Sequence, residues 1–184
     1  MTEKPRIEDE EILRLYASGL RDFSGYQIWI NQIVKTSLSG VDFSGQDLSD
    51  SYLEKIDLSG AILIGTALYS ACLDGANLSD TNLTGAALAS ASMFGVNLTN
   101  ATLIDAELWN AEISGCNLTN ANLIRADLKG AMFTDNALTD ANLTGVNLEE
   151  IYCFSGNIFQ NTNAARWQHS FRSNLKVRFH KNVG

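Results

Sequence analysis

The sequence predicts an all-β solenoid, in which the chain turns repeatedly around one hydrophobic axis. From Leu38 to Leu148 every fifth residue is large and apolar, and 19 of these 23 residues are Leu. The residue two places before each of them is usually small, and in 12 of the 23 units it is Ala. Similar residues also recur at multiples of 20 positions, as Ile64, Ile104 and Ile124 do. These three observations point to stacked coils of 20 residues.

The five-residue period decides the shape of each coil. It fits neither a helix of 3.6 residues per turn nor a strand of period two, because either would scatter the Leu residues over all its faces. The chain must therefore turn once in every unit, and the Leu and the small residue two places before it point inwards together. Four turns close a square, which explains the recurrence at 20 residues. Successive coils are expected to stack about 4.8 Å apart.

Residues 1–22 are expected to form a helix that caps the first coil. Acidic residues at 8–11 suit the N-terminus of a helix, and Gly19 suits its end. Between them an apolar side is supplied by Ile12, Leu13, Leu15 and Tyr16. The polar side is acidic, whereas a membrane-binding helix would be basic, so a cap is the preferred interpretation.

The repeat is expected to span residues 23–158 and is clearest over 36–150. Fainter members of the same register are Phe23, Ile28 and Ile33 at one end and Ile158 at the other. Residues 159–184 follow as an irregular basic tail. The open coil at each end of a solenoid would template aggregation, so both ends need a cover.

Several units share a short consensus. AlaAsnLeuSerAsp at 76–80, AlaAsnLeuIleArg at 121–125 and AlaAspLeuLysGly at 126–130 each place Asn or Asp between Ala and Leu. In this the chain resembles the pentapeptide repeat family, whose consensus is A(D/N)LXX, over residues 36–150 without a gap. The segment at 13–25 is similar to the lead-in of many cyanobacterial members. The resemblance implies a right-handed quadrilateral parallel β-helix, here of about six to seven coils.

Residues 163–184 have two competing interpretations. Related proteins often close with a segment of the MetProAspGly type, but this chain has AsnAlaAlaArgTrp at that place. Another reading frame of this stretch can encode such a segment, so a frame-shifted end is one hypothesis. A genuine basic tail for an acidic or nucleic-acid partner is the other. The coding DNA decides between them.

Charge divides the chain into three parts. Residues 1–35, 36–150 and 151–184 have net charges of −1, −12 and +5, which together give the −8 of the chain. The acidic middle part repels phosphate, so the repeat body is not expected to bind nucleic acid directly. Only the tail could attract it.

Composition argues against several other classes. The chain has no run of 18 apolar residues for a membrane span, and its N-terminus lacks the apolar core of a signal peptide. A cytoplasmic location without membrane contact is therefore expected. Three Cys without a CxxC pair and two isolated His predict no disulfide framework, no metal site and no cofactor.

No catalytic constellation is expected. Flat, solvated walls offer no cleft that would separate the pKa values of two carboxyl groups. Cys116 should be inert packing, Cys153 should occupy a core position, and Cys72 should point outwards without a His partner. An enzyme with a small-molecule substrate is not predicted.

Outward residues that share a side under the 20-residue rule are candidate functional surfaces. The candidate acidic face contains Asp47, Asp50, Glu107, Asp127, Glu149 and Glu150. The candidate partner surface contains Ile62, Ile64, Ile104 and Ile124. A further apolar cluster is expected from Tyr52, Phe94, Met132, Tyr152 and Phe154, with Trp109 on a third side. Each set is either a binding surface or a group of tolerated surface residues.

The function predicted from these features is that of a non-catalytic interaction or scaffold protein with a regulatory role. Its partner is expected to be another protein, and a homodimer is left open. The alternative is a DNA mimic that binds a type II topoisomerase, gyrase, through the acidic face, as quinolone-resistance members of the family do. The chain lacks loops projecting from its coils and an apolar dimerisation helix in its tail, which counts against the alternative.

Overall fold

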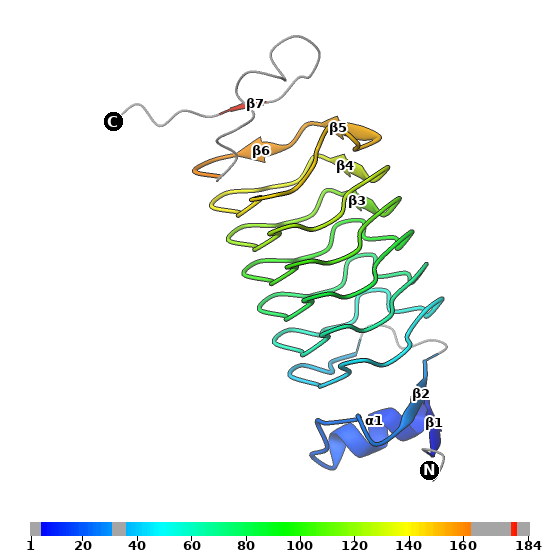
Figure 1. Cartoon of the computed structure of the whole chain (residues 1–184). Helices are drawn as coiled ribbons and strands as arrows, with labels where there is room; N and C mark the ends of the chain where they lie inside the picture. Colours follow the sequence, from blue (N-terminus) through cyan, green and yellow to red (C-terminus); the bar gives the residue numbers. More distant parts are fainter. Residues whose placement is uncertain (1–4, 31–35, 163–177, 180–184) are drawn as a thin grey trace.

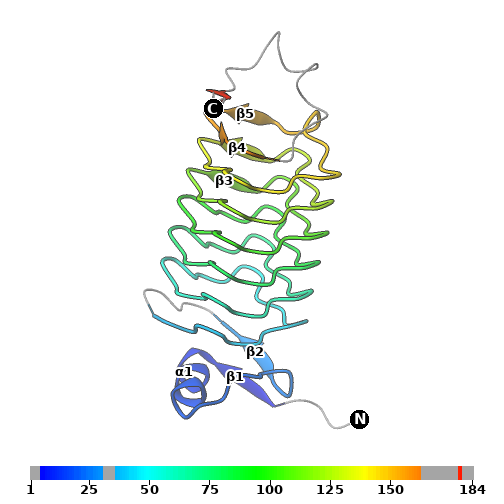
Figure 2. The ribbon, with the colours of Figure 1, turned by 90° about the vertical axis from the view of Figure 1, so that its left-hand side faces the viewer.

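The computed structural model describes residues 5–30, 36–162 and 178–179 and shows a β-helix. Two perpendicular views show the coils stacked along one axis, with α1 at the N-terminal end and β5 and β6 at the opposite end (Figures 1 and 2). The predicted solenoid is thereby confirmed. The predicted core position of Ile33 and most of the tail at 163–184 lie outside the described residues.

Each coil is held to the next by backbone hydrogen bonds at a spacing of 20 residues. Asp57 bridges Asn77 in parallel, and the Leu58 amide donates to the Asn77 carbonyl oxygen at 2.8 Å. The Asn77 amide in turn donates to the Ile56 carbonyl oxygen at 2.8 Å. The same alternation recurs from coil to coil, so the ladder runs parallel to the axis of the solenoid.

The interior is the predicted column of large apolar side chains. All 23 residues of the Leu38-to-Leu148 register are at most 4% exposed. The small residues two places earlier, such as Ala61 and Ala101, are also buried. Burial of a Leu side chain contributes about 1.5 to 3 kcal/mol, so the filled axis supplies the main stabilisation of the fold.

Corners of the coil need one residue with a left-handed backbone. The Ala61 amide donates to the Leu58 carbonyl at 3.0 Å, which closes a tight turn, and Gly60 within it has φ of 66°. Where the residue is not Gly it is often Asn, Asp or Ser, as at Asn100 with φ of 59°. Gly, Asn and Asp tolerate this region best, which explains why most units end in one of these three residues.

A short helix and two strands precede the regular coils. Strand β1 (Arg6–Glu8) pairs in parallel with β2 (Gln27–Trp29), and α1 (Asp9–Ala17) lies between them in the sequence. Ile12 of α1 is fully buried, and the Tyr16 hydroxyl donates to the Ser39 carbonyl oxygen at 2.8 Å. The helix thus occupies only part of the 1–22 segment, since β1 precedes it.

The other strands lie in the C-terminal half. Strands β3 (Glu112–Ser114), β4 (Met132–Thr134) and β5 (Cys153–Ser155) form one parallel sheet, and β6 (Ile158–Phe159) pairs with β7 (Arg178–Phe179). Elsewhere in the described coils the pairing consists of isolated bridges, because each side of the square is only a few residues long.

One extra residue shifts the register at the C-terminal end. Met132 pairs with Cys153 and Phe133 with Phe154, so the spacing there is 21. Cys153 therefore aligns with the outward column and Phe154 with the core column, the reverse of the prediction. Ile158 is 46% exposed while its neighbour Phe159 is 6% exposed. The prediction that Ile158 continues the core is wrong, because a shift of one residue exchanges the two sides of a strand.

Polar side chains replace the turn hydrogen bond at one interior corner. Asn136 accepts from the Cys116 amide at 2.8 Å and donates to the Ile113 carbonyl at 2.9 Å. Asn157 repeats the arrangement one coil later, accepting from the Asn136 amide at 2.9 Å and donating to the Phe133 carbonyl at 2.8 Å. Both Asn side chains are at most 1% exposed, so these bonds satisfy buried backbone groups.

Asn136→Ala is expected to destabilise the fold by about 2 to 4 kcal/mol, because it leaves a buried amide and a buried carbonyl without partners. The matched control is Asn142→Ala, whose side chain bonds only to the backbone and hydroxyl of Thr144 on the outer surface. We expect the control to lose less than about 1 kcal/mol. Urea unfolding followed by circular dichroism measures both, and equal losses would contradict the role given to Asn136.

Candidate functional site

The outward side chains form four flat faces, on which residues 20 apart lie in columns. We define the isoleucine face as the sides at 41–45, 61–65, 81–85, 101–105, 121–125 and 141–145. We define the aromatic–acidic face as the sides at 46–50, 66–70, 86–90, 106–110, 126–130 and 146–150. Columns on both faces follow from the bridges Asp42↔Ile62↔Asn82 and Asp47↔Ala67↔Ala87.

The isoleucine face holds all four predicted Ile residues, but they form an interrupted surface. Ile62 and Ile64 are 40% and 43% exposed, whereas Ile104 and Ile124 are half-buried. Thr84 stands between Ile64 and Ile104 in the column. Beside the column, Arg125 holds Asp105 through two hydrogen bonds of 2.6 Å, which lower the pKa of that carboxyl group.

The six predicted acidic residues do lie on one face, in two groups. Asp47 and Asp50 lie near its N-terminal end, and the other four lie towards its C-terminal end: Glu107, Asp127, Glu149 and Glu150. Ala67 and Ala87 separate the groups in the column that joins Asp47 to Glu107. Lys129 lies 3.7 Å from Glu150 and partly neutralises the second group.

An aromatic pair stands between the two acidic groups. Tyr69 and Trp109 occupy one column two coils apart, with ring centroids 6.5 Å from each other and planes inclined at 50°. They are 39% and 38% exposed, while Ala89 between them is 1% exposed. The rings thus lean together over Ala89 and form one apolar ridge.

Glu107 is fixed against this ridge. The Tyr69 hydroxyl donates to a Glu107 carboxylate oxygen at 3.2 Å. The negative charge of Glu107, more than burial, raises the pKa of Tyr69, so the phenol keeps its proton. Exposed rings and a positioned carboxylate together suit a partner that is both apolar and cationic.

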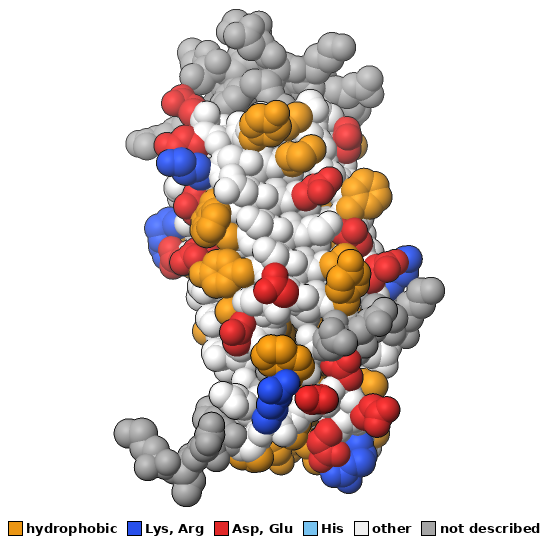
Figure 3. All heavy atoms as spheres, turned by 90° about the vertical axis from the view of Figure 1, so that its right-hand side faces the viewer, with side chains coloured by type: hydrophobic (Ala, Val, Ile, Leu, Met, Phe, Trp, Pro, Cys, Tyr) orange, Lys and Arg blue, Asp and Glu red, His pale blue; other side chains and the backbone are white. Residues whose placement is uncertain are grey.

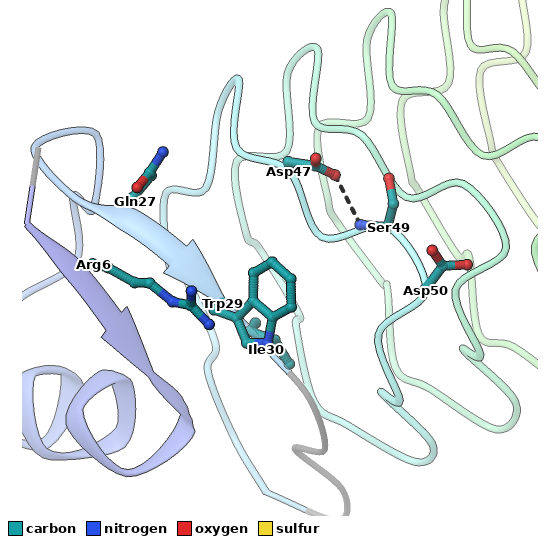
Figure 4. A pocket seen from close by; sticks show the side chains of 7 residues that line it. All are labelled: Arg6, Gln27, Trp29, Ile30, Asp47, Ser49 and Asp50. Carbon is teal, nitrogen blue, oxygen red and sulfur yellow. Dashed lines mark hydrogen bonds between the residues drawn. The ribbon is translucent and has the colours of Figure 1, made fainter. Parts of the chain in front are cut away.

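A pocket of about 510 Å³ opens at the N-terminal end of the same face (Figure 4). One wall comes from β1 and β2, and the other from the first coil, where Asp47 accepts from the Ser49 amide at 3.1 Å. The Arg6 guanidinium lies 4.4 Å from the centre of the Trp29 ring, which is 57% exposed. The lining residues are Arg6, Gln27, Trp29, Ile30, Asp47, Ser49 and Asp50.

The third apolar cluster is not contiguous. Tyr52 and Met132 share a column in which Cys72, Ser92 and Glu112 intervene. Phe94 lies in the neighbouring column, Tyr152 is 80% exposed beyond the register shift, and Phe154 aligns with the core column as described above. From the side of β3, β4 and β5, hydrophobic side chains stand apart among polar and acidic ones (Figure 3).

Sequence reasoning missed the aromatic–acidic combination. It set Trp109 on a side of its own, did not connect it with the acidic residues, and passed over Tyr69. The available signal was the 20-residue rule itself, since Tyr69 and Trp109 differ by 40 positions. The pocket could not be found in this way, because it depends on how β2 sits against the first coil.

Two observations on the described residues concern metal binding and thiol reactivity. Among them no three His, Cys, Asp or Glu side chains gather in a group that could hold a metal ion. Burial raises the pKa of Cys116 to about 12, so this thiol is not a nucleophile near neutral pH. No helix among residues 5–30, 36–162 and 178–179 is long and apolar enough to cross a membrane.

A chain that turns every five residues around a square, Leu-filled axis is a β-helical repeat protein that presents flat side-chain faces. The family model for pentapeptide repeats matches it with eight copies, over residues 36–75, 71–110, 81–120 and 111–149. The chain therefore belongs to the pentapeptide repeat family.

Solved structures of this family are similar to the chain. HetL of the cyanobacterium Nostoc sp. PCC 7120 is 31% identical over 85% of this chain and 81% of its own, with a TM-score of 0.34. A pentapeptide repeat protein of the Arabidopsis thaliana thylakoid lumen is 37% identical over 54% and 70%, with a TM-score of 0.38. QnrB1, a plasmid-mediated fluoroquinolone resistance protein, is 18% identical over 88% and 86%, with a TM-score of 0.45. No protein with a curated description matches the chain.

Only Cys72 and Cys153 are expected to react with Ellman's reagent in the native protein, because both are half-buried whereas Cys116 is enclosed and remains protonated. The third thiol should appear after denaturation. Cys116→Ala, which copies Ala76 two column positions away, should leave the native count unchanged and remove the latent thiol. A native count of three would contradict the assigned burial.

Proposed function

We propose that this protein is a non-catalytic scaffold that binds another protein through its aromatic–acidic face. The observation that carries the proposal is the Tyr69–Trp109 ridge, which stands exposed between two acidic groups on a rigid wall. Trp and Tyr side chains in contact with a partner contribute much of the binding energy of protein interfaces. The isoleucine face is the less favoured surface, because Thr84 interrupts it and two of its Ile residues are half-buried.

Rigidity of the wall supports this function. The Leu88 amide bonds to the Glu107 carbonyl at 2.8 Å and the Ser90 amide to the Trp109 carbonyl at 3.0 Å, so the backbone beneath the ridge is fixed. A preorganised surface loses little conformational entropy when it binds. Affinity can therefore come from few side chains.

The proposal includes the architecture that keeps the wall intact. We infer six to seven coils capped by α1, a count that follows from about 20 residues per coil. The cap is supported by the burial of Ile12 and by the hydrogen bond from Tyr16 to Ser39. HetL is described as involved in the regulation of heterocyst differentiation, and a regulatory role exerted by binding is the corresponding proposal here.

A second candidate function is mimicry of DNA towards a type II topoisomerase. It is favoured by the alignment of six carboxylates on one face of the solenoid. It is weakened by Ala67 and Ala87, which break the acidic column, and by Lys129 beside Glu150. A phosphate mimic needs charge that continues along the rod, whereas this charge comes in two separate groups around an apolar ridge.

Affinity enrichment with column-matched variants tests the scaffold function. Trp109→Ala and Tyr69→Ser copy residues already present in their column, Ala89 and Ser49, and Ile124→Thr does the same with Thr84. Partners bound by the wild-type protein should be lost with the first two variants and kept with the third. A purified partner should bind Trp109→Ala at least tenfold more weakly in calorimetry, which is about 1.4 kcal/mol.

Two results would overturn that assignment. Loss of the partner only with Ile124→Thr would move the binding site to the isoleucine face. Retention by all three variants would show that neither face binds it.

Gyrase supercoiling is expected to continue unchanged when the protein is added in titration, because the carboxylates are not continuous. The assay is run at low and high salt, with Asp127→Asn as the variant. Inhibition that weakens with salt and disappears in the variant would instead establish the DNA-mimic function.

A further inference from the structure

Any partner that covers the aromatic ridge also covers a carboxylate. Glu107 accepts from the Tyr69 hydroxyl at 3.2 Å, so its negative charge lies beside the joined rings of Tyr69 and Trp109. Removal of a carboxylate from water is costly unless a positive group pairs with it. A wholly apolar partner would leave Glu107 covered without such a group. The partner must therefore supply a cation at this place.

A second negative charge lies next to Glu107. Glu107 bridges Asp127 in parallel, so the two residues are neighbours in one column, about 4.8 Å apart along the axis. Both side chains are exposed. Lys129, the one basic side chain of this face among the described residues, lies 3.7 Å from Glu150. Glu107 and Asp127 thus have no cation of their own in the described part of the chain.

The isoleucine face shows how the solenoid pairs a carboxylate internally. There Arg125 follows Asp105 by 20 residues and holds it through two hydrogen bonds of 2.6 Å. On the aromatic–acidic face, Asp127 follows Glu107 by the same 20 residues. An acidic residue therefore stands where an Arg would make the equivalent internal pair.

The N-terminal region of the same chain shows which cation suits a Trp ring beside a Glu. The Arg6 guanidinium lies 4.4 Å from the centre of the Trp29 ring (Figure 4), and one of its nitrogens lies 3.4 Å from a Glu8 oxygen. Glu8 pairs with Trp29 in the register of β1 and β2, so ring, guanidinium and carboxylate form one cluster. Arg21 likewise lies 3.8 Å from the centre of the Tyr16 ring.

The aromatic ridge has the ring and the carboxylate of such a cluster without the guanidinium. Glu107 lies two residues before Trp109, and alternate residues of an extended segment point to the same side. In the described ranges no Arg or Lys is stacked on the ring of Trp109 or Tyr69. A guanidinium is planar, so it can stack on a ring and pair with a carboxylate at once. An ammonium is a more strongly hydrated point charge and lacks this planar contact.

Other occupants fit this surface less well. A second copy bound through the same face would bring carboxylates against carboxylates, and a nucleic acid or an anionic membrane would be repelled. Addition of a β-strand needs unpaired backbone groups. Here the Glu107 amide already bonds to the Ala86 carbonyl at 2.9 Å, and its carbonyl accepts from the Leu88 amide at 2.8 Å. Recognition must therefore come from side chains.

We propose that the ridge of Tyr69 and Trp109, together with Glu107 and Asp127, binds an arginine side chain presented by the partner protein. This inference rests on the proposed scaffold function and specifies the chemistry of its partner. The guanidinium stacks on the exposed ring of Trp109 and pairs with Glu107, and the charge of Asp127 adds to the attraction.

Three labelled peptides titrated with the full chain test the proposal by fluorescence anisotropy. They are repeats of Gly-Ser-Arg, Gly-Ser-Lys and Gly-Ser-citrulline, and citrulline keeps the shape of arginine without its charge. The arginine peptide should bind most tightly. We expect at least about threefold weaker binding of the lysine peptide and at least about tenfold weaker binding of the citrulline peptide.

Two variants of equal charge separate a site from general attraction to an acidic face. Glu107→Gln and Glu149→Gln each remove one negative charge from the same face, but Glu149 lies two coils beyond Trp109 in its column. The first should weaken binding of the arginine peptide by about tenfold and the second by less than about twofold. Trp109→Ala should also weaken it by about tenfold, while Ile124→Thr should leave it unchanged.

Each contrary result overturns a defined part. Equal binding of the arginine and citrulline peptides, or binding of neither, would overturn the assignment of a cation, and equal binding of the lysine peptide would overturn the choice of arginine. Equal effects of Glu107→Gln and Glu149→Gln would remove the site. A partner that is lost with Trp109→Ala but enriched as before by Glu107→Gln would overturn this inference and leave the scaffold function standing.

Discussion

Stacking of one Leu-filled coil on the next is the constraint on which the rest of this structure depends. Each inward Leu is buried in the axis while its amide bonds to the following coil, as Leu103 does with the Asn122 carbonyl at 2.7 Å. Packing and hydrogen bonding therefore require the same 20-residue register. A residue that disturbs one disturbs the other, which is why the repeat continues over 23 units.

Because of this constraint, inward residues determine the fold, whereas outward residues are free to vary and can bind a partner. Interior positions tolerate polar groups where these find a hydrogen-bond partner, as the Thr66 hydroxyl does by donating to the Phe43 carbonyl oxygen at 2.8 Å. Outward positions carry no such requirement, and one column can hold Ser49, Tyr69, Ala89 and Trp109 in succession. The side chains available for binding therefore lie in the outward columns, and the coil spacing fixes how far apart the backbone positions of these residues are.

Much of this could be predicted from the sequence, because a solenoid converts sequence spacing directly into spatial position. The core column, the Ile residues of one face and the shared side of the six acidic residues all follow from the periods of 5 and 20. The errors arise where the period fails. One extra residue before Cys153 exchanged the sides of Phe154 and Ile158, and no local signal in the sequence marks that shift.

Other features depend on three-dimensional geometry that the 5- and 20-residue periods of the sequence do not predict. The pocket beside Trp29 forms because β2 pairs with β1 instead of closing tightly on the first coil. The lean of Tyr69 and Trp109 over Ala89 also needs side-chain directions, although their common column was readable. The polar corner at Asn136 appears in the sequence only as an irregular unit.

A coil insertion most directly tests the central claim, that coil stacking holds Tyr69 and Trp109 together as one ridge. Duplication of residues 71–90 adds one coil between Tyr69 and Trp109, which moves them apart by about 4.8 Å without changing any face. Duplication of residues 121–140 adds a coil beyond Trp109 and is the matched control. We predict that both proteins fold and that only the first loses the partner protein enriched by the wild-type chain; equal retention by both would contradict the account.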